Sequence, residues 1–171
     1  MNVVLIGYRG TGKSTVAKLL AERLGLEAVS TDRLIEERIG TSIAAFVAGH
    51  GWPEFRAVEA KVVREVAARD HLVIDTGGGA VLDPASASAL RRNARVFWLT
   101  ASPATIVTRI GGDAARPPLA PGLTLEDEIV RVLGEREPIY RALADHVLQS
   151  ETLSPAEVAD RIVAQLGQAH T

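Results

Sequence analysis

The stretch at residues 7–14, GYRGTGKS, constrains this chain most, because it matches the pattern GxxxxGK[ST] of a phosphate-binding P-loop. It follows the apolar run at residues 3–6 and leads into a helix-patterned stretch from Lys13 to Leu24. Glycines let such a loop turn tightly and point its N–H groups at phosphate oxygens, and the helix dipole adds positive charge. A glycine-rich turn that binds nothing is the structural alternative, but the flanking strand and helix favour a P-loop.

Two polar residues of this motif have expected tasks at a bound nucleotide. Lys13 is expected to reach the β and γ phosphates. Ser14 is expected to place its hydroxyl on the Mg²⁺ that bridges them, because this ion needs oxygen ligands and usually takes one or two from protein. The motif therefore predicts ATP as the phosphate donor and Mg²⁺ as the metal.

Length and composition limit the class of protein. The 171 residues predict one domain, residues 1–171, which is large enough for an enclosed site. With 19 basic and 21 acidic residues the net charge is −2, so a nucleic-acid partner is not expected, and the lack of cysteine excludes disulfides and thiolate metal sites. No apolar run approaches about 18 residues, so we expect no membrane span or signal peptide and a cytoplasmic location.

Short apolar runs alternate with longer helix-patterned stretches, which predicts an α/β fold with a doubly wound parallel sheet flanked by helices. Nearly continuous Val, Ile and Leu in these runs suit strands that are buried on both faces. Five strands are expected: Asn2–Ile6, Glu27–Ser30, Leu72–Asp75, Val96–Leu99 and His146–Gln149. Ligands of such a sheet bind beyond the carboxyl ends of the strands, so the residues that follow each strand are the candidates for function.

The second strand is followed by an acidic helix start. Thr31 or Asp32 is expected to cap this helix. Alternatively, the Asp32 carboxylate faces an acceptor and takes its hydroxyl proton while the γ-phosphoryl group leaves ATP. One orientation does not easily serve both roles, and the residues leave the choice open.

Two further segments allow either a purely structural or a ligand-binding interpretation. Arg56 and Glu59 are three apart on one helix face, where they form either a surface ion pair or a pair in which Glu59 holds Arg56 for a substrate carboxylate. The triple glycine at residues 77–79 costs conformational entropy, which suggests close approach of backbone to a ligand, although a tight packing turn is the alternative.

The stretch from Arg109 to Gly122 mixes glycines, prolines and two arginines. It predicts either a mobile lid that brings Arg116 onto the transferred phosphate or a proline-rich loop with solvated arginines. In the next helix, Arg136 lies between two glutamates, which is typical of a solvated face, and Pro138 is expected to kink or end the helix. Near the end of the chain, Ser154 and Pro155 begin a well-capped helix.

Six short motifs occur in one order along the chain: GYRGTGKS, TDRLIEERIG, EFRAVE, TGGGAV, ARPPL and EREPIY. Together they closely resemble the shikimate kinase family over essentially the full length. The resemblance implies a five-stranded sheet of the nucleoside-monophosphate-kinase type, with a substrate-binding segment at about residues 32–60 and a lid at about residues 111–123. It also implies transfer of the ATP γ-phosphate to the 3-hydroxyl of shikimate, for chorismate and aromatic amino acid synthesis, by a monomer.

The resemblance also assigns roles to the candidate residues. Asp32 would bind shikimate hydroxyls and act as the base, while Lys13 and Arg116 would stabilise the phosphoryl group. The shikimate carboxylate would be clamped by two arginines, and three glycines would line the same pocket: Arg56, Arg136, Gly77, Gly78 and Gly79. The P-loop backbone would cradle the phosphates through Arg9, Gly10, Thr11, Gly12, Lys13, Ser14 and Thr15. Arg109 and Pro155 correspond to positions that flank the adenine ring.

The sequence departs from the family pattern at three places. Ser30 stands where an acidic residue commonly helps to hold magnesium waters, and we hypothesise that Asp75, at the end of the third strand, supplies the missing carboxylate beside Ser14. Pro118 replaces a leucine-like residue, which predicts a stiffer lid. Trp52 and Pro53 stand where a glutamate is frequent, so support of Arg56 falls more heavily on Glu59.

The sequence leaves two other functions open. A different small-molecule kinase, such as a gluconate or nucleoside-monophosphate kinase, shares the P-loop and lid but does not predict the FR, GGG and REPIY motifs together. A shikimate-kinase-like protein that binds nucleotide without turnover is favoured only by the Ser30 departure. The retained set of Lys13, Asp32, Arg56, Arg116 and Arg136 argues against it, because a binding module needs no phosphoryl-transfer arginine.

Overall fold

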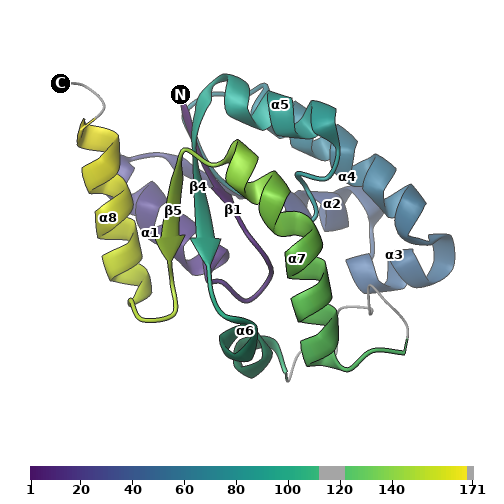
Figure 1. Cartoon of the computed structure of the whole chain (residues 1–171). Helices are drawn as coiled ribbons and strands as arrows, with labels where there is room; N and C mark the ends of the chain where they lie inside the picture. The colour runs from purple at the N-terminus through teal and green to yellow at the C-terminus, as the bar shows by residue number, and fades with distance from the viewer. Residues whose placement is uncertain (112–121, 169–171) are drawn as a thin grey trace.

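One parallel sheet of five strands, in the order β2-β3-β1-β4-β5, forms the centre of the computed structural model, which describes residues 1–111 and 122–168 (Figure 1). The strands are β1 (Asn2–Ile6), β2 (Glu27–Ser30), β3 (Leu72–Asp75), β4 (Ala94–Thr100) and β5 (His146–Gln149). The predicted α/β class is therefore confirmed. Strand β4 begins before the predicted Val96, because its polar Arg95 interrupts the apolar pattern yet still pairs with Val3 of β1.

Helices cover both faces of this sheet. Within the described residues they are α1 (Lys13–Leu24), α2 (Thr31–Ile39), α3 (Ile43–His50), α4 (Trp52–Ala67), α5 (Pro84–Arg92), α6 (Pro103–Ile110), α7 (Leu125–Leu143) and α8 (Pro155–Gln168). Figure 1 shows α1 and α8 on one side and α4, α5 and α7 on the other. No helix in these described ranges has the length and apolar character needed to span a bilayer.

Alternation along the strands divides the core between the two faces. In β1, Val3 and Leu5 pack with α1 and α8, whereas Val4 and Ile6 pack with α4, α5 and α7. All four side chains are at most 2% exposed, so both sheet faces are buried, as the nearly continuous apolar runs predicted.

A third, smaller cluster lies at the carboxyl end of the sheet. It contains Tyr8 of the P-loop, Ile106 of α6, and Ile129 and Val132 of α7, all buried. This cluster fixes the beginning of the P-loop against α6 and α7, the two helices that flank residues 112–121.

Two local expectations are revised by the structure. Ser30, rather than Thr31 or Asp32, caps α2, because its hydroxyl accepts a hydrogen bond from the Arg33 N–H at 3.4 Å. The capping prediction was therefore wrong, and Asp32 lies in the first turn with its side chain not needed as the cap. Pro138 does not end its helix, since α7 continues through it to Leu143.

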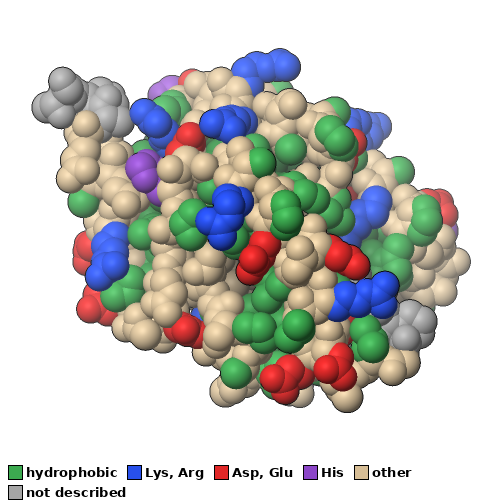
Figure 2. All heavy atoms as spheres, viewed as in Figure 1, with side chains coloured by type: hydrophobic (Ala, Val, Ile, Leu, Met, Phe, Trp, Pro, Cys, Tyr) green, Lys and Arg blue, Asp and Glu red, His purple; other side chains and the backbone are tan. Residues whose placement is uncertain are grey.

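Charged side chains of both signs are interspersed on the face that Figure 2 shows, which agrees with the nearly balanced composition. Across the described residues several charged side chains form exposed ion pairs, such as Arg131 with Glu135 and Arg38 with Glu65. Such exposed pairs contribute little to the stability of the fold.

Candidate active site

The P-loop joins β1 to α1 in a conformation that only glycine tolerates well. Gly7, Gly10 and Gly12 have φ angles of 141°, 78° and 90°. The Lys13 ammonium folds back over the loop and donates to the carbonyls of Gly7 and Tyr8 at 2.8 and 3.0 Å. The loop is thus shaped in advance, with its cation already at the place where phosphates bind in such motifs.

A cavity lies beside this loop, at the carboxyl end of the sheet. Its lining combines P-loop residues with the ends of β2 and β3: Arg9, Gly10, Gly12, Lys13, Ser14, Thr15, Ser30, Asp32, Asp75, Thr76, Gly77 and Gly78. Of the predicted P-loop set, only Thr11 is missing from this lining, because it is buried and donates its hydroxyl to the Tyr8 carbonyl. We call this space the phosphate cavity.

Ser14 and Asp75 meet in the phosphate cavity. The Ser14 hydroxyl donates to the Asp75 carboxylate at 2.6 Å. Asp75 is 7% exposed, and it is the register partner of Ser30 on the adjacent strand β2. A carboxylate is therefore present beside the P-loop serine, one strand away from Ser30.

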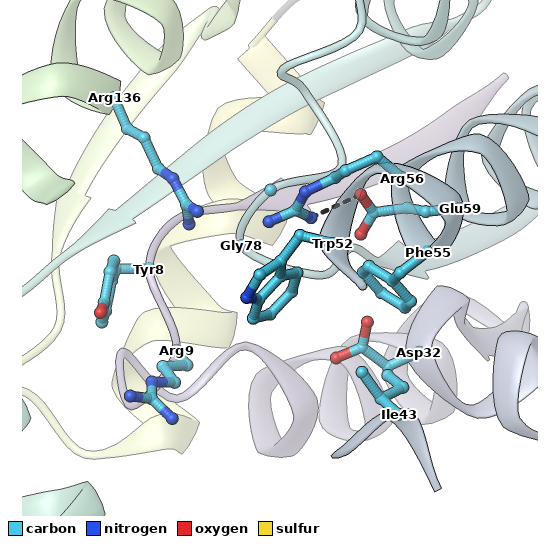
Figure 3. A pocket seen from close by; sticks show the side chains of 11 residues that line it. Tyr8, Arg9, Asp32, Ile43, Trp52, Phe55, Arg56, Glu59, Gly78 and Arg136 are labelled. Atoms are coloured by element: carbon cyan, nitrogen blue, oxygen red, sulfur yellow. Dashed lines mark hydrogen bonds and ion pairs between the residues drawn. The ribbon is translucent and has the colours of Figure 1, made fainter. Parts of the chain in front are cut away.

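A second cavity, which we call the acceptor cavity, adjoins the first. It is lined by Tyr8, Arg9, Asp32, Ile43, Trp52, Phe55, Arg56, Glu59, Gly78, Gly79 and Arg136 (Figure 3). Every predicted substrate-binding residue except Gly77 is in this set. Three of the residues, Arg9, Asp32 and Gly78, line both cavities, so the two spaces meet there.

The triple glycine gives space to the side chains of the site. A Cβ atom on Gly77 would overlap the Asp32 carboxylate, and one on Gly79 would overlap the Arg56 guanidinium. A Cβ on Gly78 would lie 3.2 Å from an Arg136 guanidinium nitrogen. None of the three has a positive φ angle, so the benefit of glycine here is space for these side chains rather than backbone conformation.

Arg56 is held from two directions. Its guanidinium donates to the Glu59 carboxylate at 2.7 Å, and its Cζ lies 5.0 Å from the centre of the Trp52 ring. The predicted ion pair is thus present, but Glu59 is only 3% exposed, so this pair does not belong to the surface. Burial raises the pKa of the Glu59 carboxyl, while the neighbouring Arg56 opposes that shift.

Arg136 points into the acceptor cavity from α7. Arg136 is only 7% exposed, so the interpretation of its flanking glutamates as a sign of a solvated position was wrong. Its Cζ lies 5.8 Å from the Tyr8 ring centre. One turn further along α7, the Tyr140 hydroxyl donates to the Gly78 carbonyl at 2.5 Å, which ties the helix of Arg136 to the triple glycine.

Two predicted residues, Arg109 and Pro155, are not among the described residues that line either cavity. Arg109 of α6 donates to the carbonyls of Gly10 and Ser150, at 3.0 and 3.3 Å. Pro155 is exposed at the start of α8. Arg116, together with Pro118 of the predicted lid, falls outside the described residues.

Several residues that line the acceptor cavity were not among the predicted site residues. Trp52 and Phe55 share one face of α4 with Arg56 and Glu59, and their helical spacing offered a signal. Tyr8 occupies a variable position of the P-loop pattern, so the motif gave no reason to select it.

Comparisons with known proteins decide the family. The sequence model of the family described as Shikimate kinase matches residues 9–167. The shikimate kinase of Syntrophus aciditrophicus is 41% identical, over 95% of this chain and 89% of the relative. The chain belongs to the shikimate kinase family. It is accordingly an ATP-dependent kinase with a P-loop, as the sequence predicted.

Solved structures agree with this family assignment. A shikimate kinase from Acinetobacter baumannii in complex with shikimate superposes with a TM-score of 0.93 at 30% identity, covering 98% of this chain and 93% of that chain. A gluconokinase from Sinorhizobium meliloti reaches a TM-score of 0.61 at 17% identity, covering 98% and 92%. The second likeness shows a shared fold only.

The raised pKa of Glu59 gives a testable pH dependence. A raised pKa means that the folded state binds this proton more tightly than the unfolded chain, so stability falls as pH rises from the usual 4.5 through the raised value. Glu59→Gln removes this titration. The free energy of unfolding of the variant minus that of the wild type should therefore rise with pH in this window.

Urea unfolding across a pH series that begins below 4.5 measures this difference. Glu135→Gln, which removes an exposed carboxylate from α7, serves as the matched control. If the free energy of unfolding of Glu59→Gln minus that of the wild type falls as pH rises, the result would contradict the buried position of the Glu59 carboxylate.

Proposed function

We propose that this chain transfers the γ-phosphoryl group of ATP to the 3-hydroxyl of shikimate, giving shikimate 3-phosphate for chorismate and aromatic amino acid synthesis. One observation carries the proposal: Arg56 and Arg136 converge in a cavity that shares Asp32 with the phosphate cavity. Two guanidinium groups suit one carboxylate, and a carboxylate at the junction suits a hydroxyl that is to be phosphorylated. The relative from Acinetobacter baumannii, which is in complex with shikimate, supports this acceptor.

The walls of the acceptor cavity favour a ring-shaped acid over a linear one. Ile43, Trp52 and Phe55 present apolar surface, while the two arginines and Asp32 supply the polar contacts. Gluconate also offers a carboxylate and hydroxyls, but its open chain has a hydroxyl on nearly every carbon and gains little from apolar walls. The cavity therefore fits shikimate better than gluconate.

In the proposed reaction, the Asp32 carboxylate accepts the proton of the acceptor hydroxyl while that oxygen bonds to the γ-phosphorus. The bond from the γ-phosphorus to the bridging oxygen breaks, and ADP leaves with the electron pair. During this transfer Lys13, which already lies over the loop at the carbonyls of Gly7 and Tyr8, would stabilise the phosphate oxygens. We propose that Arg116 adds a second cation and that Arg109 and Pro155 flank the adenine ring.

We infer that Ser14 and Asp75 hold Mg²⁺. Their oxygens are 2.6 Å apart beside the P-loop, and Mg²⁺ usually takes one or two oxygen ligands from protein, with phosphates and water completing the shell. When bound, the ion neutralises negative charge on the phosphates. We propose that Asp75 replaces the carboxylate that is missing at Ser30, since the two residues are register partners on neighbouring strands.

Other expectations from the sequence stay predictions: the single domain, the substrate-binding segment at about residues 32–60, the lid at about residues 111–123, the monomeric state and the cytoplasmic location.

ADP release tests the proposed function. The protein is incubated with ATP and Mg²⁺, alone or with shikimate, gluconate or a nucleoside monophosphate. Release that depends on shikimate, and not on the other acceptors, is expected. Release with gluconate or a nucleotide instead would contradict the acceptor, and no release from protein that binds ATP would favour a binding protein on a kinase scaffold.

Asp75→Ala tests the metal site. Loss of a carboxylate at or near a metal typically weakens metal binding about 10- to 100-fold, so the Mg²⁺ concentration for half-maximal rate should rise by a similar factor. The exposed Asp160→Ala on α8, which loses only an ion pair with Arg23, is the control. An unchanged magnesium titration of Asp75→Ala would remove this residue from the metal site.

A further inference from the structure

Arg9 lies where the two cavities meet. Together with Asp32 and Gly78 it lines both of them, and its side chain is 15% exposed. In Figure 3, Arg56 and Arg136 point into one end of the acceptor cavity, whereas Asp32 and Arg9 lie at the other end. The P-loop role given to Arg9 so far concerns its backbone, so its guanidinium still needs an explanation.

The Tyr8 ring separates two positive groups. The Cζ of Arg9 lies 6.0 Å from the centre of this ring, and the Cζ of Arg136 lies 5.8 Å from it. Tyr8 is 1% exposed and packs into the cluster between α6 and α7, so it is a fixed spacer. The spacer keeps the Arg9 cation away from the two carboxylate-binding arginines and near the hydroxyl end of the cavity.

A buried carboxylate faces Arg9 without satisfying it. The Glu128 carboxylate of α7 lies 3.7 Å from the Arg9 guanidinium and is 4% exposed. Both the Arg9 Nε and this Glu128 oxygen are buried, and neither has a hydrogen-bond partner among the described residues. Glu128 therefore balances the charge of Arg9 without a hydrogen bond, and the guanidinium, which lines both cavities, is placed to meet an anion at their junction.

We propose that the Arg9 side chain binds the transferred phosphate on the acceptor side of the junction, with Glu128 as its positioning residue. The inference rests on the proposed function, because it takes the phosphorylated hydroxyl to lie beside Asp32. A guanidinium at this point attracts the negatively charged phosphate of shikimate 3-phosphate much more strongly than the neutral hydroxyl of shikimate. Arg9 thus distinguishes the product complex from the acceptor complex.

Calorimetric titration with shikimate and with shikimate 3-phosphate separates this role from a structural one. Loss of a hydrogen-bonded charge contact should weaken binding of shikimate 3-phosphate to Arg9→Met about tenfold or more, with shikimate affinity within about twofold of wild type. Arg9→Lys should recover part of the loss because it restores the charge. Glu128→Gln should weaken shikimate 3-phosphate binding in the same direction by a smaller factor.

The exposed Arg38→Met, which loses only a surface ion pair, is the matched control and should bind both ligands as wild type does. Equal losses for shikimate and shikimate 3-phosphate would overturn the inference in favour of a packing role, and so would unchanged shikimate 3-phosphate affinity in Arg9→Met. If Arg9→Met does not fold, the same comparison in Arg9→Lys and Glu128→Gln decides. Wild-type protein that binds neither ligand would overturn the proposed function itself, and the inference with it.

Discussion

Three functional side chains occupy the space in which side chains at residues 77–79 would otherwise lie. Asp32, Arg136 and Arg56 pack in turn against Gly77, Gly78 and Gly79. The turn is itself anchored, since the Thr31 hydroxyl accepts from the Gly77 N–H at 3.0 Å and Tyr140 donates to the Gly78 carbonyl. The glycine turn therefore leaves room for Asp32, Arg56 and Arg136 beside one another, and this arrangement supports the proposed acceptor.

Buried charges of opposite sign surround this turn. Glu59 faces Arg56, and Glu128 faces Arg9, so neither carboxylate is buried without a cation. The faces of Trp52 and Tyr8 give the guanidinium groups further contact at low cost in conformational entropy. These groups are oriented before any ligand binds, which is what electrostatic stabilisation of phosphoryl transfer requires.

The sequence predicted the sheet and the P-loop well, because buried parallel strands and phosphate loops leave local patterns in composition and spacing. The local pattern alone could not predict that Arg136 is buried, because two flanking glutamates are typical of a solvated face and the burial depends on packing of α7 against the turn. Only the resemblance to the family placed Arg136 at the acceptor. The sequence also could not pair Arg9 with Glu128, since these residues are far apart in the chain and meet only through the cluster around Tyr8. The cap at Ser30 was missed because Thr31 and Asp32 are equally good capping residues.

The shikimate affinity of Gly79→Ala, measured beside its ATP affinity, tests most directly whether the triple glycine positions the acceptor site. The added methyl group would overlap the Arg56 guanidinium, so shikimate binding should weaken about tenfold or more while ATP binding changes little. Gly134→Ala on α7, where a Cβ meets open space, should bind both as wild type does. Unchanged shikimate affinity in Gly79→Ala, or an equal loss for ATP, would contradict the account.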